Sequence, residues 1–181
     1  MNGVAVYPKQ VSRRGTPMRA PTRAALTAVA LVVVALTVLA VPATAGTAVP
    51  FKGRVQGAET STFIDPTHLS VTRENTGNAT HLGRFTAVEH FVVDLTTLTA
   101  TGTEVFTAAN GDLVFATTSG VATPIPGTTD LSLEEFVTIT GGTGRFAGAT
   151  GSVTGERVLG ATGLSAGSFD GTISSPGASK H

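Results

Sequence analysis

The feature that most constrains the fold is an alternation of apolar and polar residues with a period of two, which recurs along the chain after residue 45. In residues 51–57 the odd positions carry Phe, Gly, Val and Gly, whereas the even positions carry Lys, Arg and Gln. A period of two places successive side chains on opposite faces of a β-strand, and no apolar period of 3.6 residues runs for three turns. The sequence therefore predicts an all-β domain of antiparallel strands.

Turn residues divide this alternation into eight segments. The turns are expected at 76–78, at Asn110-Gly111, in the loop 124–130 and in the glycine-rich stretch 141–151, and Asn-Gly suits the positive φ angles of a tight hairpin. The strands are expected at 50–60, 67–75, 82–95, 101–108, 112–122, 131–140, 151–159 and 166–174. Eight sequential strands predict an eight-stranded antiparallel β-barrel, whose lumen is filled or holds one small ligand. A two-sheet sandwich remains the alternative.

The first 45 residues have the pattern of an export signal. The first 23 contain five of the twelve basic residues and no acid, and residues 24–41 carry no charge. Pro42-Ala43-Thr44-Ala45 follows, with small residues at the positions that a signal peptidase inspects. We therefore expect an N-terminal signal helix over 1–45 and a secreted, extracellular or cell-envelope protein.

Cleavage after Ala45 would leave a barrel domain over 46–176 and a frayed tail over 177–181. Cleavage after Ala48 is an alternative, as is an uncleaved anchor, because 18 apolar residues are just long enough to cross a bilayer. If the signal is cleaved at either site, we expect the chain to contact a membrane only through the signal segment, before cleavage. Arg13-Arg14 also allows twin-arginine export, and Met18 is an alternative start.

Charge and cysteine content limit the partners of the exported part. After residue 45 the chain has seven basic and twelve acidic side chains, which gives a net charge near −5, and it has no cysteine. A mildly acidic surface without a Lys/Arg stripe argues against nucleic acid and against docking to anionic lipid. The domain must therefore be stabilised by its core, without disulfides.

The run TGGTG, residues 140–144, follows an apolar strand as in a dinucleotide-binding motif. That motif needs a helix next, but RFAG and then ATGSVTGERVLGATG follow; the second run contains four more glycines and has no helical period. A glycine-bent corner between two strands is the alternative that we favour. No bound nucleotide or other cofactor is expected.

ITGGTGRFAGATGS, residues 139–152, together with SFDGTIS, residues 168–174, resembles the signature of bacterial proteins of the allene oxide cyclase-like barrel family. Plant dirigent proteins and bacterial spirotetronate cyclases have a similar glycine-rich corner. The resemblance implies a calycin-like eight-stranded antiparallel barrel, often dimeric or trimeric, with an apolar lumen. In that family the lumen folds a reactive hydrophobic substrate for cyclisation or coupling without a cofactor.

Four charged residues interrupt stripes that are otherwise apolar. Glu89 lies in the stripe Phe85, Ala87, Phe91, Val93, and Glu135 lies in the stripe Leu131, Leu133, Val137, Ile139. Arg73 follows Leu69 and Val71, and Arg157 lies between Gly155 and Leu159. If these stripes face inward, two acids and two arginines share a dry lumen, where each charge needs a partner.

These charges have two interpretations. In the first, the charges are structural: they form a buried ion-pair network near the barrel's end, or a bulge turns Glu135 outward. Alternatively Glu89 or Glu135, with a pKa raised by apolar surroundings, acts catalytically by moving a proton or steering an oxygen-bearing substrate. Arg73 or Arg157 would then hold a substrate carboxylate or enolate.

Other catalytic and metal-binding patterns are missing from the sequence. The histidines show no i, i+2 or i, i+4 pairing, so no metal site is expected; they are His68, His81, His90 and His181. The chain has no Gly-x-Ser-x-Gly elbow and no thiol, so a hydrolase of familiar type is disfavoured.

Three functions remain open. The first is a secreted barrel that binds a hydrophobic small molecule in its lumen, with wall residues Phe85, Phe91, Phe115 and Phe169. The second is a cofactor-independent cyclase or isomerase acting on a hydrophobic substrate through Glu89 or Glu135. The third is a self-associating structural protein of the cell envelope. We also expect the protein to form a homo-oligomer, either a dimer or a trimer.

Overall fold

The computed structural model describes residues 46–174. The signal helix expected over 1–45 and the tail expected over 177–181 lie outside the described residues. In the described part of the chain, no helix is both long enough and apolar enough to cross a membrane.

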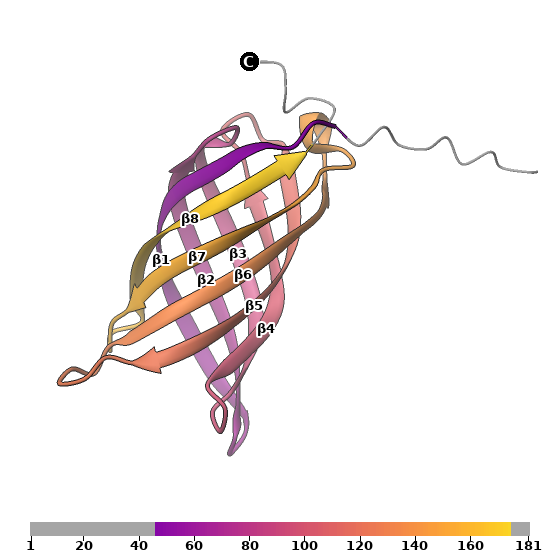
Figure 1. Cartoon of the computed structure of the whole chain (residues 1–181). Coiled ribbons are helices and arrows are strands. Elements are labelled where there is room, and N and C mark those ends of the chain that lie inside the picture. The colour runs from indigo at the N-terminus through magenta and orange to yellow at the C-terminus, as the bar shows by residue number, and fades with distance from the viewer. Residues whose placement is uncertain (1–45, 175–181) are drawn as a thin grey trace, which may run out of the picture. The chain divides into compact units, whose positions relative to one another are not determined.

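Eight antiparallel strands close into a barrel in chain order (Figure 1). The strands are β1 Val49–Asp65, β2 His68–Ala79, β3 Gly83–Asp94, β4 Thr99–Thr107, β5 Leu113–Pro124, β6 Leu131–Gly142, β7 Thr150–Leu159 and β8 Leu164–Ser174. The pairing of β1 with β8, from Val49↔Ile173 to Ala58↔Leu164, closes the sheet. The predicted eight-stranded barrel is confirmed, and the two-sheet sandwich is ruled out.

The alternation places the predicted apolar stripes inside the barrel. Along β3 the burial of side chains alternates strictly from Phe85 to Phe91, and β6 follows the same pattern from Leu133 to Ile139. The register of β2 against β3 sets Arg73 opposite Glu89, both facing inward. The charged residues of the stripes therefore share the lumen.

The turn expected at 76–78 is wrong, because residues 76–78 belong to β2 and the turn follows at 80–82. Gly77 has a packing role instead. A Cβ on Gly77 would lie 2.6 Å from Cζ of Phe85, so the missing side chain makes room for the phenyl ring. A hairpin at Asn110-Gly111 is confirmed, but its connection spans 108–112, and Gly111 has a positive φ of +86° whereas Asn110 does not.

The glycine-rich corner is also confirmed, and it closes one end of the barrel. A 3-10 helix, η1 Gly144–Phe146, connects β6 to β7, and the Phe146 side chain is fully buried. Asp112 accepts a hydrogen bond from the Arg145 backbone N–H at 3.1 Å, which ties the corner to the β4–β5 turn. No long helix follows the TGGTG run, so the dinucleotide motif is not formed.

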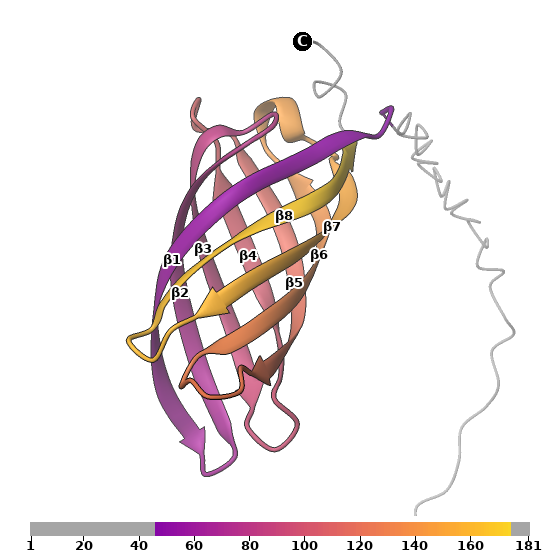
Figure 2. The same ribbon diagram turned by 60° about the vertical axis from the view of Figure 1, so that its left-hand side comes forward.

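One half of the lumen is filled with side chains. Four phenylalanine rings pack with centroids 5.2–6.5 Å apart, in tilted and edge-on pairs. We call these rings, Phe51, Phe85, Phe106 and Phe169, the aromatic plug. Phe85 and Phe106 lie near the ends of β3 and β4 that adjoin the turns at 80–82 and 108–112. These turns and η1 are at the upper end of the barrel in Figure 2.

Candidate functional site

A belt of polar side chains crosses the lumen next to the aromatic plug. Each of the eight strands contributes at least one inward-facing member. In chain order the belt consists of Glu59, Arg73, Asn75, Glu89, Glu104, Thr118, Glu135, Arg157 and Ser165. Because charges removed from water must be paired, their mutual contacts determine whether this layer is stable.

Arg73 is the centre of the belt. Its Nε lies 3.0 Å from Glu59 Oε2, and its Nη1 lies 3.0 Å from Glu89 Oε2 and also ion-pairs with Glu135 Oε1. The side chain is only 3% exposed. Burial opposes the charge of Arg73, but its three carboxylate neighbours outweigh burial and raise its pKa.

Arg157 lies deeper, against the aromatic plug. Its Nε donates to Glu135 Oε2 at 3.1 Å, and its Nη1 donates to Asn75 Oδ1 at 2.9 Å and to Ser165 Oγ at 3.3 Å. Asn75 in turn donates from Nδ2 to Glu104 Oε1 at 3.3 Å. Glu135 therefore bridges the two arginines, and the buried ion-pair network predicted as one alternative is present. It lies in the interior of the strands and not near the barrel's end, where it was expected. The bulge that would turn Glu135 outward is not formed.

The belt contains more carboxyl groups than guanidinium groups, because Glu59, Glu89, Glu104 and Glu135 share only two arginines. Burial raises the pKa of Glu104 to about 8, and the nearby Glu89 and Glu135 add to this shift. Burial likewise raises the pKa of Glu89, although Arg73 opposes the change. Glu104 therefore retains a proton at neutral pH that an exposed glutamate would have lost.

A cavity of about 170 Å³ lies on the other side of the belt from the plug. Its walls are mainly apolar, and they include Val71, Phe91, Val93, Ala100, Leu131 and Leu133. The polar residues of the lining, apart from the floor, are Glu59, Ser61, Thr118, Ser119 and Glu134. Arg73, Glu89 and Glu135 form its floor. The rim of the cavity contains three half-buried leucines, Leu98, Leu131 and Leu159. They lie near the turns at 95–98, 125–130 and 160–163, which are at the lower end of the barrel in Figure 1.

The structure separates the residues predicted as a site. Arg73, Glu89, Glu135 and Phe91 line the cavity, and Arg73 Cζ lies 4.8 Å from the centre of the Phe91 ring. Three further residues face the lumen but do not line the cavity: Arg157 lies behind the floor, and Phe85 and Phe169 belong to the plug.

Phe115 is on the outer face, 37% exposed, so the prediction that it lines the lumen is wrong. The start of β5 is apolar on both faces, and Val114 and Ala116 are the inward residues. Outside, Phe115 is paired with Val105, which is paired with Val88, and the three make an apolar row. Cross-strand contact of this kind stabilises the outward position.

Several belt residues were missed. Glu59 continues the inward alternation of 51–57, and Glu104 shares the buried face of β4 with Phe106, so period two alone could have found both. Asn75 has the same parity as Arg73 in β2, but it lies next to the stretch that was misread as a turn. Thr118 and Ser165 carry no charge to make them stand out.

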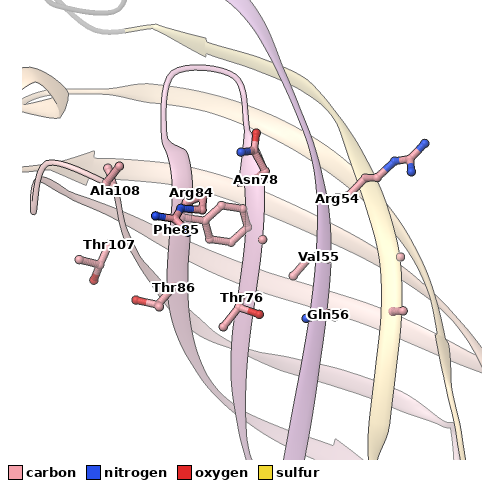
Figure 3. A pocket seen from close by; sticks show the side chains of 14 residues that line it. Arg54, Val55, Gln56, Thr76, Asn78, Arg84, Phe85, Thr86, Thr107 and Ala108 are labelled. Carbon is pink, nitrogen blue, oxygen red and sulfur yellow. The ribbon is translucent and has the colours of Figure 1, made fainter.

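A second hollow lies on the outer face of the barrel and is broad and shallow. Figure 3 shows Arg54, Asn78 and Arg84 around it, from the neighbouring strands β1, β2 and β3. The pairing register sets Arg54 opposite Asn78 and Asn78 opposite Arg84. This hollow shares no lining residue with the cavity, and Arg54, Asn78 and Arg84 are exposed around it.

Comparisons with models of protein families, with curated proteins and with solved structures find no match. Within residues 46–174, no group of three or more side chains is arranged to hold a metal ion. The fold and the site thus define a closed eight-stranded antiparallel barrel. A belt of buried charges divides its lumen into an aromatic plug and an apolar cavity.

Proposed function

We propose that the barrel binds a small hydrophobic molecule in its cavity. The observation that carries this proposal is the cavity itself: about 170 Å³ of space with apolar walls in an otherwise filled lumen. An apolar cavity of about 150 Å³ is large enough to bind benzene. The proposed ligand is therefore about the size of one substituted ring or a short branched hydrocarbon.

The shape of the lumen supports binding at this end only. The aromatic plug and Phe146 leave no comparable space at the other end, and the belt stops a ligand from penetrating further. Because Arg73 already contacts Glu89 and Glu135 on the floor, a ligand that fills the apolar part of the cavity displaces water without breaking an ion pair. Removing apolar surface from water supplies the affinity.

Native mass spectrometry of protein secreted into its own culture medium tests the proposal, with the variant Ala100→Phe as the blocked form. Ala100 lines the cavity, so a phenyl ring there would occupy the ligand's space. The matched control is Thr101→Phe, which puts the same ring on the exposed face of β4. A passenger that is present in wild type and Thr101→Phe but lost in Ala100→Phe supports binding in the cavity. Equal loss or equal retention in both variants contradicts it.

A second candidate function is a cofactor-independent cyclase or isomerase. The observation that favours it is Glu89, a carboxyl with a raised pKa on the floor of an apolar cavity, 3.0 Å from Arg73. Such a group can deliver or remove a proton within a ligand that is held in one shape. Glu89→Gln should abolish turnover of a bound substrate and leave the unfolding transition cooperative; full turnover in a folded Glu89→Gln protein would exclude this role.

Membership of the allene oxide cyclase-like barrel family is part of this proposal. Its support is the corner at 139–152, which here forms η1 and buries Phe146, together with the strand count and order. Action outside the cytoplasm is likewise proposed, from the apolar leader and its Ala43-Thr44-Ala45 site.

A further inference from the structure

The floor of the cavity is short of positive charge. Arg73 is shared among Glu59, Glu89 and Glu135, Arg157 contacts Glu135 as well, and Glu104 reaches only the Asn75 amide. The other arginines and lysine of residues 46–174 lie outside the belt, and they are Lys52, Arg54, Arg84 and Arg145. Within this region, no third guanidinium or ammonium group is available to the four glutamates.

The carboxyl groups that line the cavity are beside an aromatic ring. Glu89 and Glu135 belong to the floor, and Phe91 belongs to the wall next to them. The guanidinium carbon of Arg73 already lies 4.8 Å from the centre of the Phe91 ring, so this ring and the floor carboxylates surround one cation together. Carboxylates at the end of an apolar cavity are complementary to a cationic head on an apolar body.

We propose that the ligand of the cavity is a small hydrophobic amine, whose ammonium group pairs with Glu89 and Glu135 while its apolar part contacts the walls. This inference rests on the proposed function and names the ligand class for the same site. A ligand carboxylate would be opposed, because both arginines are already paired with glutamates and all three of these glutamates, Glu59, Glu89 and Glu135, line the cavity.

The titration behaviour of the belt agrees with this geometry. Burial raises the pKa of Glu89, because Arg73 alone does not offset the removal of this carboxylate from water. An ammonium group on the floor would supply the missing cation and favour the ionised form. The ligand would then gain a charge-assisted hydrogen bond, which is roughly twice as strong as a neutral one.

Calorimetric titration of the full-length chain at pH 7 with three probes of one size tests the inference. Benzylamine is cationic, benzyl alcohol is neutral and benzoate is anionic, and all three carry the same ring. We expect benzylamine to bind at least about tenfold more tightly than benzyl alcohol, and benzoate to bind more weakly than either. This comparison uses the unaltered protein and needs no variant.

The outcomes separate this inference from the proposed function. Benzyl alcohol or benzoate binding as tightly as benzylamine would overturn the preference for an amine and leave binding in the cavity intact. Binding of none of the three probes would overturn both.

A pair of variants tests whether the preference for an amine arises from the cavity floor. Glu89→Gln keeps the shape of the side chain and removes its charge, so it should reduce the ratio of benzylamine to benzyl alcohol affinity by about tenfold. The matched control is Glu74→Gln, on the outer face of β2, which should leave that ratio unchanged. An equal change in both variants would show that the preference comes from the overall charge of the protein and not from the cavity.

Discussion

At the scale of single residues, Arg73 holds the belt together, because three carboxylates converge on one guanidinium that is almost wholly buried. Replacing it by methionine would leave Glu59, Glu89 and Glu135 without their common partner. Breaking a buried ion pair by removing one member costs about 3–5 kcal/mol, so Arg73→Met should lower the free energy of unfolding by about that amount. Urea denaturation measures the loss, and exposed Arg54→Met is the control, expected to change stability by less than about 0.5 kcal/mol. Equal losses would mean that the belt is not stabilised through Arg73.

Glu104 should make the free energy of unfolding of the barrel decrease as the pH rises. Its pKa is about 8 in the folded chain, against an ordinary value of 4.5, so between these limits the folded state holds a proton that the unfolded state has released. The contribution of Glu104 to stability is therefore complete below about pH 4.5 and is lost as the pH rises towards 8. The loss should approach about 1.4 kcal/mol per pH unit within this window.

Glu104→Gln removes the titrating group and should make the free energy of unfolding less dependent on pH than in wild type. Denaturation curves at pH 5, 6.5 and 8 measure the difference between the two proteins. The difference should change steadily across this range. Two parallel pH profiles would refute a protonated Glu104 in the folded barrel.

At the scale of elements, the corner between β6 and β7 depends on two glycines for different reasons. Gly144 has φ +53°, and a Cβ there would lie 2.0 Å from Asp112 Oδ1, a carboxylate that already binds the Arg145 backbone. Gly148 has φ +71° and no atom within 4 Å of an added Cβ. Gly148→Ala should cost about 1–2 kcal/mol from backbone strain alone. Gly144→Ala should cost at least about 1 kcal/mol more, because Asp112 must move and lose its hydrogen bonds.

Thermal or urea denaturation of the two alanine variants makes this comparison directly. Both substitutions add one methyl group at a positive φ angle, so the difference between them isolates the contact with Asp112. If Gly148→Ala were the more damaging substitution, the corner would not be anchored to the β4–β5 turn in the way described.

Most of the fold could be predicted from period two, because burial on one face forces apolar residues to alternate wherever a strand covers the lumen. The sequential order of the strands was predicted in this way, and the inward placement of Glu89, Glu135, Arg73 and Arg157 was predicted on the condition that the apolar stripes face the lumen. The turn at 76–78 failed for a physical reason: glycine marks both turns and tight packing, and Gly77 is needed beneath the Phe85 ring. Local sequence does not distinguish these two uses.

The site could be predicted only in part. Alternation identifies a charge on an inward stripe, but the depth of that charge along the barrel depends on the register between strands. This depth puts Glu89 on the cavity floor and Arg157 behind it, and it puts Phe91 in the wall but Phe85 in the plug. The prediction for Phe115 was wrong because β5 is apolar on both faces where it begins, so the period of two does not indicate which face is inward there.

At the scale of the whole barrel, the lumen has three layers with separate roles. The aromatic plug and Phe146 belong to the hydrophobic core, and the belt links neighbouring strands through two arginines. The cavity is the part of the lumen that the side chains leave empty. Filling it by mutation would be expected to add core contacts, so the open cavity is better explained by binding than by stability.

The most direct test of this account is the position of a small apolar probe in the protein, measured by NMR as nuclear Overhauser contacts between bound benzyl alcohol and assigned side chains. We expect contacts from the ring protons to Val71, Phe91 and Leu133, and none to Phe51 or Phe106 of the plug. Contacts only to the outer face, around Arg54 and Arg84, would contradict the account and place binding in the shallow hollow on the outside of the barrel.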